Sequence, residues 1–211
     1  MNDWYSKFKK DYFPLLDVKV SHEKRGLVPG LYHRALGFDL IFSTLLKSNK
    51  SNYQIIETGS TRNPNNWKDG NSGYLFAEFV KCYGGFVRSV DINQEAVDAA
   101  NQFIDGQYHR SFCSDSVKWL ESLTDLSSID LFYLDSMDVK WGKDENSAEH
   151  HLKEFKAIEP FLSSGKIVAI DDNSKFSQDN KRTGKGRAIY EYLDSKNIKP
   201  VYDGHQIIYI W

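Results

Sequence analysis

Cysteine is scarce in this chain of 211 residues, and its two copies, Cys82 and Cys113, are widely separated. They lack the CxxC spacing of metal and redox motifs, so we expect two buried, reduced thiols. No apolar run approaches the roughly 20 residues that a membrane-spanning helix needs. Residues 1–7 lack the apolar stretch of a signal peptide. The sequence therefore predicts a cytoplasmic protein without a membrane partner.

An excess of charge of one sign is also lacking, because 27 basic and 29 acidic residues leave a formal net charge of −2. Such a chain has no overall attraction to nucleic acid or to an anionic lipid surface. Its basic residues concentrate in one place, the loop of residues 181–187. That loop is interpreted either as an ordinary solvated loop or as an anion site for a phosphorylated or carboxylated acceptor.

The clustered glycines of a dinucleotide-binding turn are missing as well. After Gly59 the next glycine is Gly70, so a pyrophosphate cannot easily lie against a helix N-terminus there. This spacing argues against a dehydrogenase. The length favours one domain over residues 1–211, with an N-terminal helical or lid region over 1–50 and the sheet-containing core over 51–211.

Apolar runs that end in acidic residues recur along the core. Four such runs, followed by helical patterns, end at Glu57, at Asp91, at Asp135 and at Asp171-Asp172. Strands that alternate with helices predict an α/β fold, a Rossmann-like, doubly wound and mostly parallel sheet covered on both faces. The turn signal Asp203-Gly204 between two apolar runs predicts an antiparallel C-terminal hairpin.

Helical patterns are expected over residues 34–46, 93–104, 147–162 and 186–195, with further helices after Ser72 and after the cap at residues 114–116. A first short helix is expected to end at Phe13, because Pro14 disfavours helix in the residue before it. Residues 21–30 are interpreted as a lid over a pocket or as packing against the outside of the sheet.

The order of the strand-end motifs resembles that of class I S-adenosylmethionine-dependent methyltransferases. The motifs are Glu-Thr-Gly-Ser, an acid closing the second strand, Ser-Asp-Ser after the third, and Leu-Asp closing the fourth. The Ile-Asp-Asp-Asn end of the fifth strand narrows the resemblance to metal-dependent O-methyltransferases of the catechol and macrocin types. It covers residues 54–211. It implies S-adenosyl-L-methionine as cofactor and a small-molecule acceptor, and it leaves open a homo-oligomer.

Residue chemistry supports part of the expected cofactor site directly. The carboxylate of Asp91 can accept hydrogen bonds from both ribose hydroxyls, and Gly59 allows close approach of the backbone to a ligand. The resemblance further implies that Glu57 meets the cationic amino-acid portion and that Asp115 and Ser116 meet the adenine. Asp115 is equally interpreted as a helix cap. The whole predicted set is Glu57, Thr58, Gly59, Ser60, Ser72, Asp91, Ile92, Asp115, Ser116 and Asp135.

A cation site is predicted where the fourth and fifth strands end. If these strands are neighbours, Asp135 lies beside Asp171 and Asp172, and three carboxylates that close repel unless they are protonated or bridged. Oxygen ligands suit Mg²⁺, Mn²⁺ or Ca²⁺, and the resemblance implies metal roles for all three. Asn173 is a further oxygen donor if the register shifts by one.

The general base is left open. In the catechol type it is a lysine three residues after the first metal aspartate, where this chain has Asp138. In the macrocin type it is an aspartate two residues after, where this chain has Met137. Asp138 is the first candidate, followed by Lys140 and His150, although His150 and His151 are also expected at the surface of a helix start.

Two alternatives to the metal-dependent O-methyltransferase remain. One is a protein that binds the cofactor but has lost turnover. The other is a methyltransferase for nucleic acid, which the chain's sequence favours less, because Leu-Asp-Ser-Met after the fourth strand is unlike the Asn-Pro-Pro-Tyr motif of many such enzymes.

Overall fold

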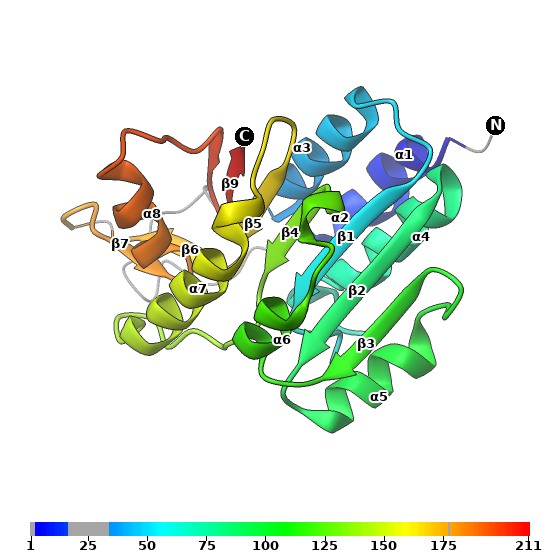
Figure 1. Cartoon of the computed structure of the whole chain (residues 1–211), viewed down its shortest axis with the longest axis horizontal. Helices are drawn as coiled ribbons and strands as arrows, with labels where there is room; N and C mark the ends of the chain where they lie inside the picture. The colour runs from blue at the N-terminus through cyan, green and yellow to red at the C-terminus, as the bar shows by residue number, and fades with distance from the viewer. Residues whose placement is uncertain (1–2, 17–33, 177) are drawn as a thin grey trace.

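A seven-stranded sheet organises the protein, whose computed structural model describes residues 3–16, 34–176 and 178–211. The strand order is β3-β2-β1-β4-β5-β9-β8, and Figure 1 shows this order from β3 to β9. β1 to β5 are parallel, and β9 is antiparallel to both β5 and β8. The strand bounds are β1 Tyr53–Thr58, β2 Gly85–Asp91, β3 His109–Cys113, β4 Leu131–Leu134, β5 Ile167–Ile170, β8 Tyr202–Asp203 and β9 Ile207–Ile210. The predicted fold class is confirmed.

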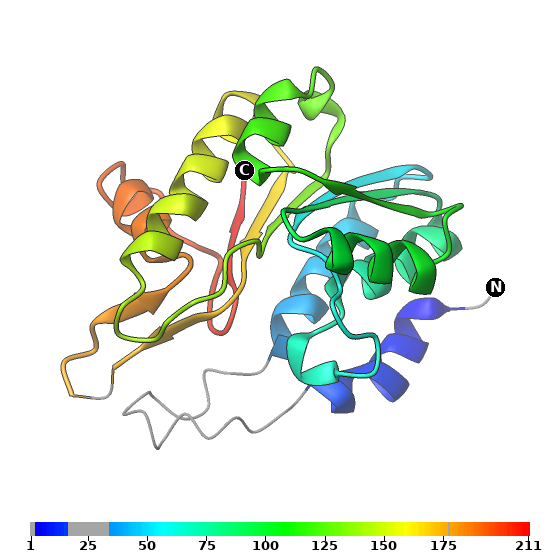
Figure 2. The ribbon, with the colours of Figure 1, turned by 90° about the horizontal axis from the view of Figure 1, so that it is seen from below.

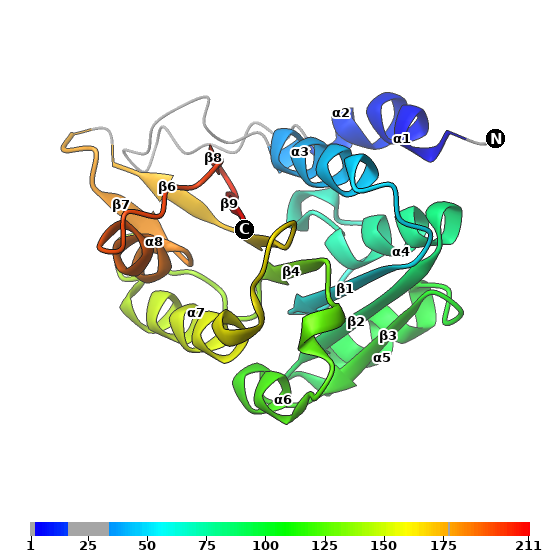
Figure 3. The ribbon, with the colours of Figure 1, turned by 45° about the horizontal axis from the view of Figure 1, so that its top comes forward.

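Helices cover both faces of this sheet (Figures 2 and 3). One face packs against the N-terminal helices and α4, and the other packs against α6, α7 and α8. The helix bounds are α1 Trp4–Lys7, α2 Phe13–Leu16, α3 Arg34–Lys47, α4 Ser72–Tyr83, α5 Gln94–Phe103, α6 Ser116–Ser122, α7 Glu145–Ile158 and α8 Arg187–Asp194. A π-helical turn, Phe8–Tyr12, joins α1 to α2, and short 3₁₀ turns lie at Trp67–Asp69, Leu126–Ser128 and Glu159–Phe161.

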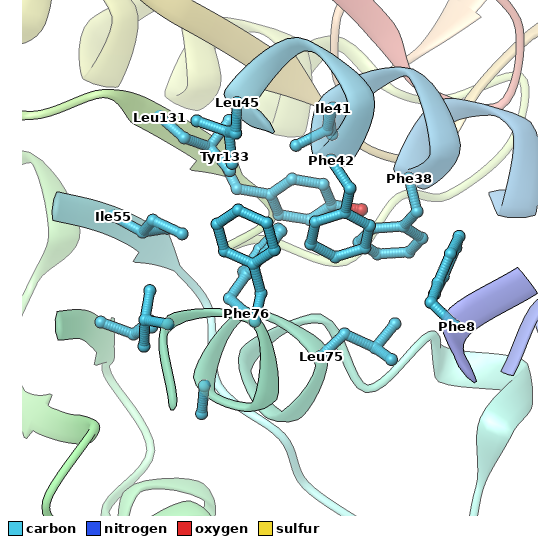
Figure 4. Close-up of a cluster of buried hydrophobic side chains, with 14 of the residues drawn as sticks. Phe8, Phe38, Ile41, Phe42, Leu45, Ile55, Leu75, Phe76, Leu131 and Tyr133 are labelled. Atoms are coloured by element: carbon cyan, nitrogen blue, oxygen red, sulfur yellow. The ribbon is translucent and has the colours of Figure 1, made fainter. Parts of the chain in front are cut away.

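Aromatic side chains fill the core on the α3 side of the sheet. Phe38 and Phe42 of α3 and Phe76 of α4 point toward Tyr133 of β4 in Figure 4, and all four are buried. Phe38 stacks on Tyr133 with ring centroids 5.6 Å apart, and Phe76 meets Tyr133 edge to face at 5.2 Å. Such pairs add geometric preference to the area that they bury. This core therefore holds α3 and α4 in place beside the central strands.

Two local expectations are wrong. The first helix does not end at Phe13, because the chain stays helical through Leu16. A π-helical turn precedes Pro14, in which the amide of Phe13 bonds to the carbonyl of Phe8, five residues earlier. The backbone before Pro14 therefore does not have the α-helical bonds that a proline would interrupt. Cys82 and Cys113 are free, as expected, but exposed rather than buried. Cys113 ends the edge strand β3, where little covers it.

Part of the basic loop belongs to an unexpected hairpin, in which β7 Arg182–Gly184 pairs with β6 Asn173–Lys175. These strands are too short and too polar for an apolar alternation to reveal them. Residues 21–30, expected as lid or packing, lie outside the described residues. Among the described helices, none has the length and apolar composition needed to span a bilayer. The cytoplasmic location and the domain division stay predictions.

Replacing Phe42 with alanine tests the aromatic core. Phe42 is fully buried among rings from three helices, so the cavity left behind should lower the free energy of unfolding by about 3–5 kcal/mol. Leu36→Ala on the same helix is the matched control, because Leu36 is 43% exposed, and its effect should stay within about 0.5 kcal/mol. Urea unfolding of both variants measures the difference, and equal losses would contradict the packing described here.

Candidate active site at the carboxyl ends of the parallel strands

A cavity of about 400 Å³ opens where β1, β2 and β4 end. Pockets for small molecules commonly measure about 300–1,000 Å³. Every residue of the predicted cofactor set lines this cavity except Thr58, namely Glu57, Gly59, Ser60, Ser72, Asp91, Ile92, Asp115, Ser116 and Asp135. Parallel strands bring their carboxyl ends to one edge, which is why strand-end residues distant in sequence meet there.

Gly59 allows β1 to turn away between its two neighbours. Its φ is +93°, and its amide donates to the carbonyl of Val90 on β2 at 2.7 Å. A Cβ at this position would lie 2.6 Å from the carbonyl oxygen of Asp135 after β4. The glycine is therefore required by contact with the protein's own backbone, in addition to any ligand.

Asp91 presents a carboxylate at the end of β2 with capacity to spare. Its two oxygens accept one backbone amide each, from Ser60 at 3.0 Å and from Asn93 at 2.8 Å. A carboxylate has about four acceptor positions, so positions remain for two further donors. Burial raises the pKa of Asp91, and the two amides oppose that shift.

Glu57 is buried at the end of β1 and lies among hydroxyl groups. Ser72 Oγ donates to one of its oxygens, and Ser89 Oγ lies 2.7 Å from the other. Ser89 Oγ also lies 2.9 Å from Nε2 of His109, whose pKa is lowered by burial to about 4. Burial raises the pKa of Glu57 to about 7, because the hydroxyl groups only partly replace the lost water. The cavity therefore contains an acid that ionises near neutral pH.

Asp115 is confirmed as a helix cap, and its contact with adenine stays a prediction. Its Oδ1 accepts from the amide of Lys118 at 3.0 Å as the N-cap of α6, and the residue also lines the cavity. Ser116 beside it pairs with Nε2 of His150 at 2.9 Å. Glu154 lies 3.4 Å from the same nitrogen, and this carboxylate chiefly raises the pKa of His150.

Thr58 does not reach the cavity, because it points into a buried polar network beneath the wall. Its hydroxyl donates to Glu154 Oε2 at 3.1 Å and accepts from the amide of Asp135 at 3.1 Å. Burial alone would raise the pKa of Glu154, but His151, His150 and nearby hydroxyls lower it to about 2. His151 is fully buried, so its expected surface position is wrong, and burial lowers its pKa to about 4.

The predicted bases differ in their position relative to the cavity. Asp138 and His150 line the cavity, whereas Lys140 is exposed and does not. Both oxygens of Asp138 accept from Arg62, each at 2.9 Å, and this pairing lowers the pKa of Asp138. A carboxylate with a lowered pKa is a weak general base at neutral pH. The choice of base stays a prediction.

The neighbouring strands β4 and β5 place Asp135, Asp171 and Asp172 at one edge, but Asp135 is outside the group whose ligand atoms converge, and protein cations lie among the three acids. Lys185 Nζ bonds to Asp135 Oδ1 and lies 2.9 Å from Asp172 Oδ2. Arg34 lies 3.2 Å from Asp171 and 3.4 Å from Asp172. A divalent ion prefers ligands whose oxygens are free to converge on it. The arrangement does not fit the predicted ion while these cations keep their places.

His205 joins the same cluster. Its Nε2 lies 3.4 Å from Asp171 Oδ1 and 3.3 Å from Asp172 Oδ1, and together the three side chains could supply three ligand atoms. Arg34 nevertheless contacts both of these carboxylates. Asn173, the expected further donor, is turned away, because its Oδ1 accepts from the amide of Gly186 at 2.7 Å.

The basic loop is neither simply solvated nor arranged as an anion site. Arg182 forms a bidentate pair with Asp203, and Arg187 pairs with Asp144 at 2.8 Å. Lys185 is 2% exposed within the acidic cluster. These three basic groups are therefore engaged by the protein's own carboxylates.

Sequence reasoning missed several groups of the site. Arg62, Thr61, Asp69, Asn71, Val90, Asn93 and Ser136 also line the cavity. Arg62 and Asn71 belong to the long turn between β1 and α4, whose length was a usable signal. Arg34 and His205 reach the cluster from distant elements and carried no local signal.

No family model and no curated protein sequence matches this chain. One similar solved structure is the MycE methyltransferase from the mycinamycin biosynthetic pathway, in complex with Mg, S-adenosylhomocysteine and mycinamycin VI. It is 15% identical, with a TM-score of 0.47, and the match covers 80% of this chain and 38% of the MycE chain. A S-adenosylmethionine-dependent methyltransferase from Geobacter sulfurreducens is 10% identical, with a TM-score of 0.43 and 70% and 49% covered. Human N-acetylserotonin methyltransferase is 16% identical, with a TM-score of 0.41 and 67% and 35% covered. The chain thus spans between about a third and half of the length of each of these structures.

The ionisation of Glu57 can be measured directly. In protein with ¹³C-labelled glutamate carboxyl groups, one resonance should titrate with a midpoint near pH 7 and vanish in Glu57→Gln. Ser89→Ala should move that midpoint upward, because the serine hydroxyl stabilises the ionised form. If every glutamate titrates below about pH 5, the buried environment described for Glu57 is wrong.

Proposed function

We propose that this protein is an S-adenosylmethionine-dependent methyltransferase that acts on a hydroxyl group of a small molecule. One observation carries the proposal: Glu57 and Asp91, from adjacent parallel strands, both face one cavity at the carboxyl edge of the sheet. A nucleoside with a cationic amino-acid tail can be bound by one acid that accepts from its hydroxyl groups and a second acid that pairs with its ammonium group. The strand-end motifs that resemble O-methyltransferases support the same reading.

In this proposal, each part of the cofactor contacts specific residues that line the cavity. The free acceptor positions of Asp91 bind the ribose hydroxyls, and Asp115 with Ser116 borders the adenine. Glu57 pairs with the α-ammonium group once it is ionised. In this proposal the sulfonium lies toward Asp135, Ser136 and Met137, which also line the cavity.

The transfer step is a direct displacement. The acceptor oxygen attacks the methyl carbon in line as the carbon–sulfur bond breaks, leaving the neutral thioether, and the hydroxyl proton passes to a base. His150 and Asp138 are the predicted bases that line the cavity. This mechanism uses no divalent ion, because the arrangement of the predicted ligands does not fit one. A homo-oligomer and a cytoplasmic location stay predictions.

One observation favours a second candidate, a protein that binds the cofactor without turnover. The first predicted base, Asp138, is held by Arg62 in a two-point ion pair. A methyl-transfer assay on hydroxylated small molecules separates the two candidates, and it depends on finding an acceptor.

Calorimetric titration with S-adenosylmethionine tests the cofactor site without an acceptor. Wild type should bind, and Asp91→Ala should weaken binding by about 10- to 100-fold, because hydrogen bonds to a charged group contribute about 1.5–3 kcal/mol. Asp98→Ala is the control, since Asp98 lies on α5 away from the cavity and bonds to Gln94. No binding by folded wild type would end the proposal.

The same titration should depend on pH through Glu57. Its raised pKa of about 7 means that acid conditions protonate it, and binding of an ammonium group must then expel that proton. Affinity should therefore be roughly eightfold weaker at about pH 6 than at about pH 7.5. Glu57→Gln should bind weakly with little change over this range. A wild-type affinity independent of pH would contradict the pairing.

A further inference from the structure

The cluster of Asp135, Asp171 and Asp172 contains a buried lysine that the transfer mechanism does not use. Lys185 is 2% exposed, and its ammonium group bonds to Asp135 and lies 2.9 Å from Asp172. The ammonium group therefore lies between the two aspartates and contacts both.

The β6–β7 hairpin fixes the backbone of Lys185 at this position. Asn173 pairs with Gly184 across the hairpin, and the amide of Lys185 donates to the carbonyl of Asp172 at 3.2 Å. Gly184 has a φ of +110°, and a Cβ there would collide with the backbone of Asp172. The next amide, of Gly186, is held by Asn173. The lysine is therefore held by backbone bonds at the end of β7 and does not reach in from a solvated loop.

Two positive side chains already offset most of the acidic charge of the cluster without an added ion. Three carboxylates face Lys185, Arg34 and, 3.3–3.4 Å from two of the acids, the imidazole of His205. A divalent ion bound by the same oxygens would lie near two positive side chains and would be repelled by both. It would also have to break contacts that are largely shielded from water.

We propose that the Lys185 ammonium group is the resident cation of this cluster, so that the protein holds Asp135 in the cavity wall and transfers methyl groups without a divalent ion. Lys185 acts as a positioning residue, since it does not line the cavity and Asp135 does. The amide of Asp135 is also fixed by Thr58, so backbone and side chain of this wall residue are both held. The part concerning methyl transfer depends on the proposed function; the part concerning the cation does not.

Titration with Mn²⁺, followed by the electron paramagnetic resonance signal of the free ion, tests the inference. Wild type should bind no stoichiometric Mn²⁺ at about 1 mM. Lys185→Met should gain one site whose dissociation constant is at least about tenfold below that concentration. Lys185→Arg, which keeps the charge, should resemble wild type. Lys175→Met is the matched control, because Lys175 lies in the same hairpin but pairs with Asp203 at 3.0 Å.

Either of two results overturns the inference: stoichiometric Mn²⁺ binding by wild type that Asp171→Asn removes, or a folded Lys185→Met variant that gains no site. Should Lys185→Met not fold, wild type and Lys185→Arg still decide, because binding by either contradicts the inference and binding by neither supports it. These titrations need no S-adenosylmethionine, so their failure and a failure of the proposed function are separate results. In addition, S-adenosylmethionine should bind wild type equally well with Mg²⁺ and with EDTA.

Discussion

Removing carboxylates from water is the constraint on which the rest of this structure depends. The carboxyl ends of five parallel strands lie at one edge of the sheet, and four of these strands end at acids that are buried or partly buried. Each buried carboxylate needs a partner, because an unpaired charge in a low-dielectric interior is strongly unfavourable. The protein provides different partners at different points. Hydroxyl groups meet Glu57, backbone amides meet Asp91, and cationic side chains meet Asp171 and Asp172.

These partners divide the edge of the sheet into two parts. Around β1 and β2 the acids have neutral donors and retain acceptor capacity toward a cavity, as Asp91 does. Around β5 the acids are neutralised by Lys185 and Arg34 and lie away from the cavity. Neutral partners leave a carboxylate free to respond to a ligand, whereas ionic partners satisfy it. Asp135 lies at the boundary, since it lines the cavity and also bonds to Lys185.

Much of the fold and of the cavity could be predicted, because both depend on local patterns. An apolar run that ends in an acid identifies the end of a parallel strand, and parallel strands place their ends together, so Glu57, Asp91 and Asp135 were expected to meet. Capping was equally local: Asn93 and Asp115 both accept from amides of the helices that follow them. The local rule for Pro14 predicted the wrong helix end, because the π-helical turn before it depends on packing and no neighbouring residue indicates it.

The ion pairs could not be predicted, because they join residues that only the folded chain brings together. Strands β1 to β5 lie between Arg34 and Asp171 in the sequence, yet the two side chains lie 3.2 Å apart. Lys185 was recognised as one of several loop cations, and its burial follows from a hairpin too short to carry a periodic pattern. A row of acids alone is therefore ambiguous: it marks the edge where a cation belongs, but it does not distinguish a metal ion from an ammonium group. That distinction depends on which basic side chain the tertiary structure brings to the acids, and here it is Lys185, directly after β7.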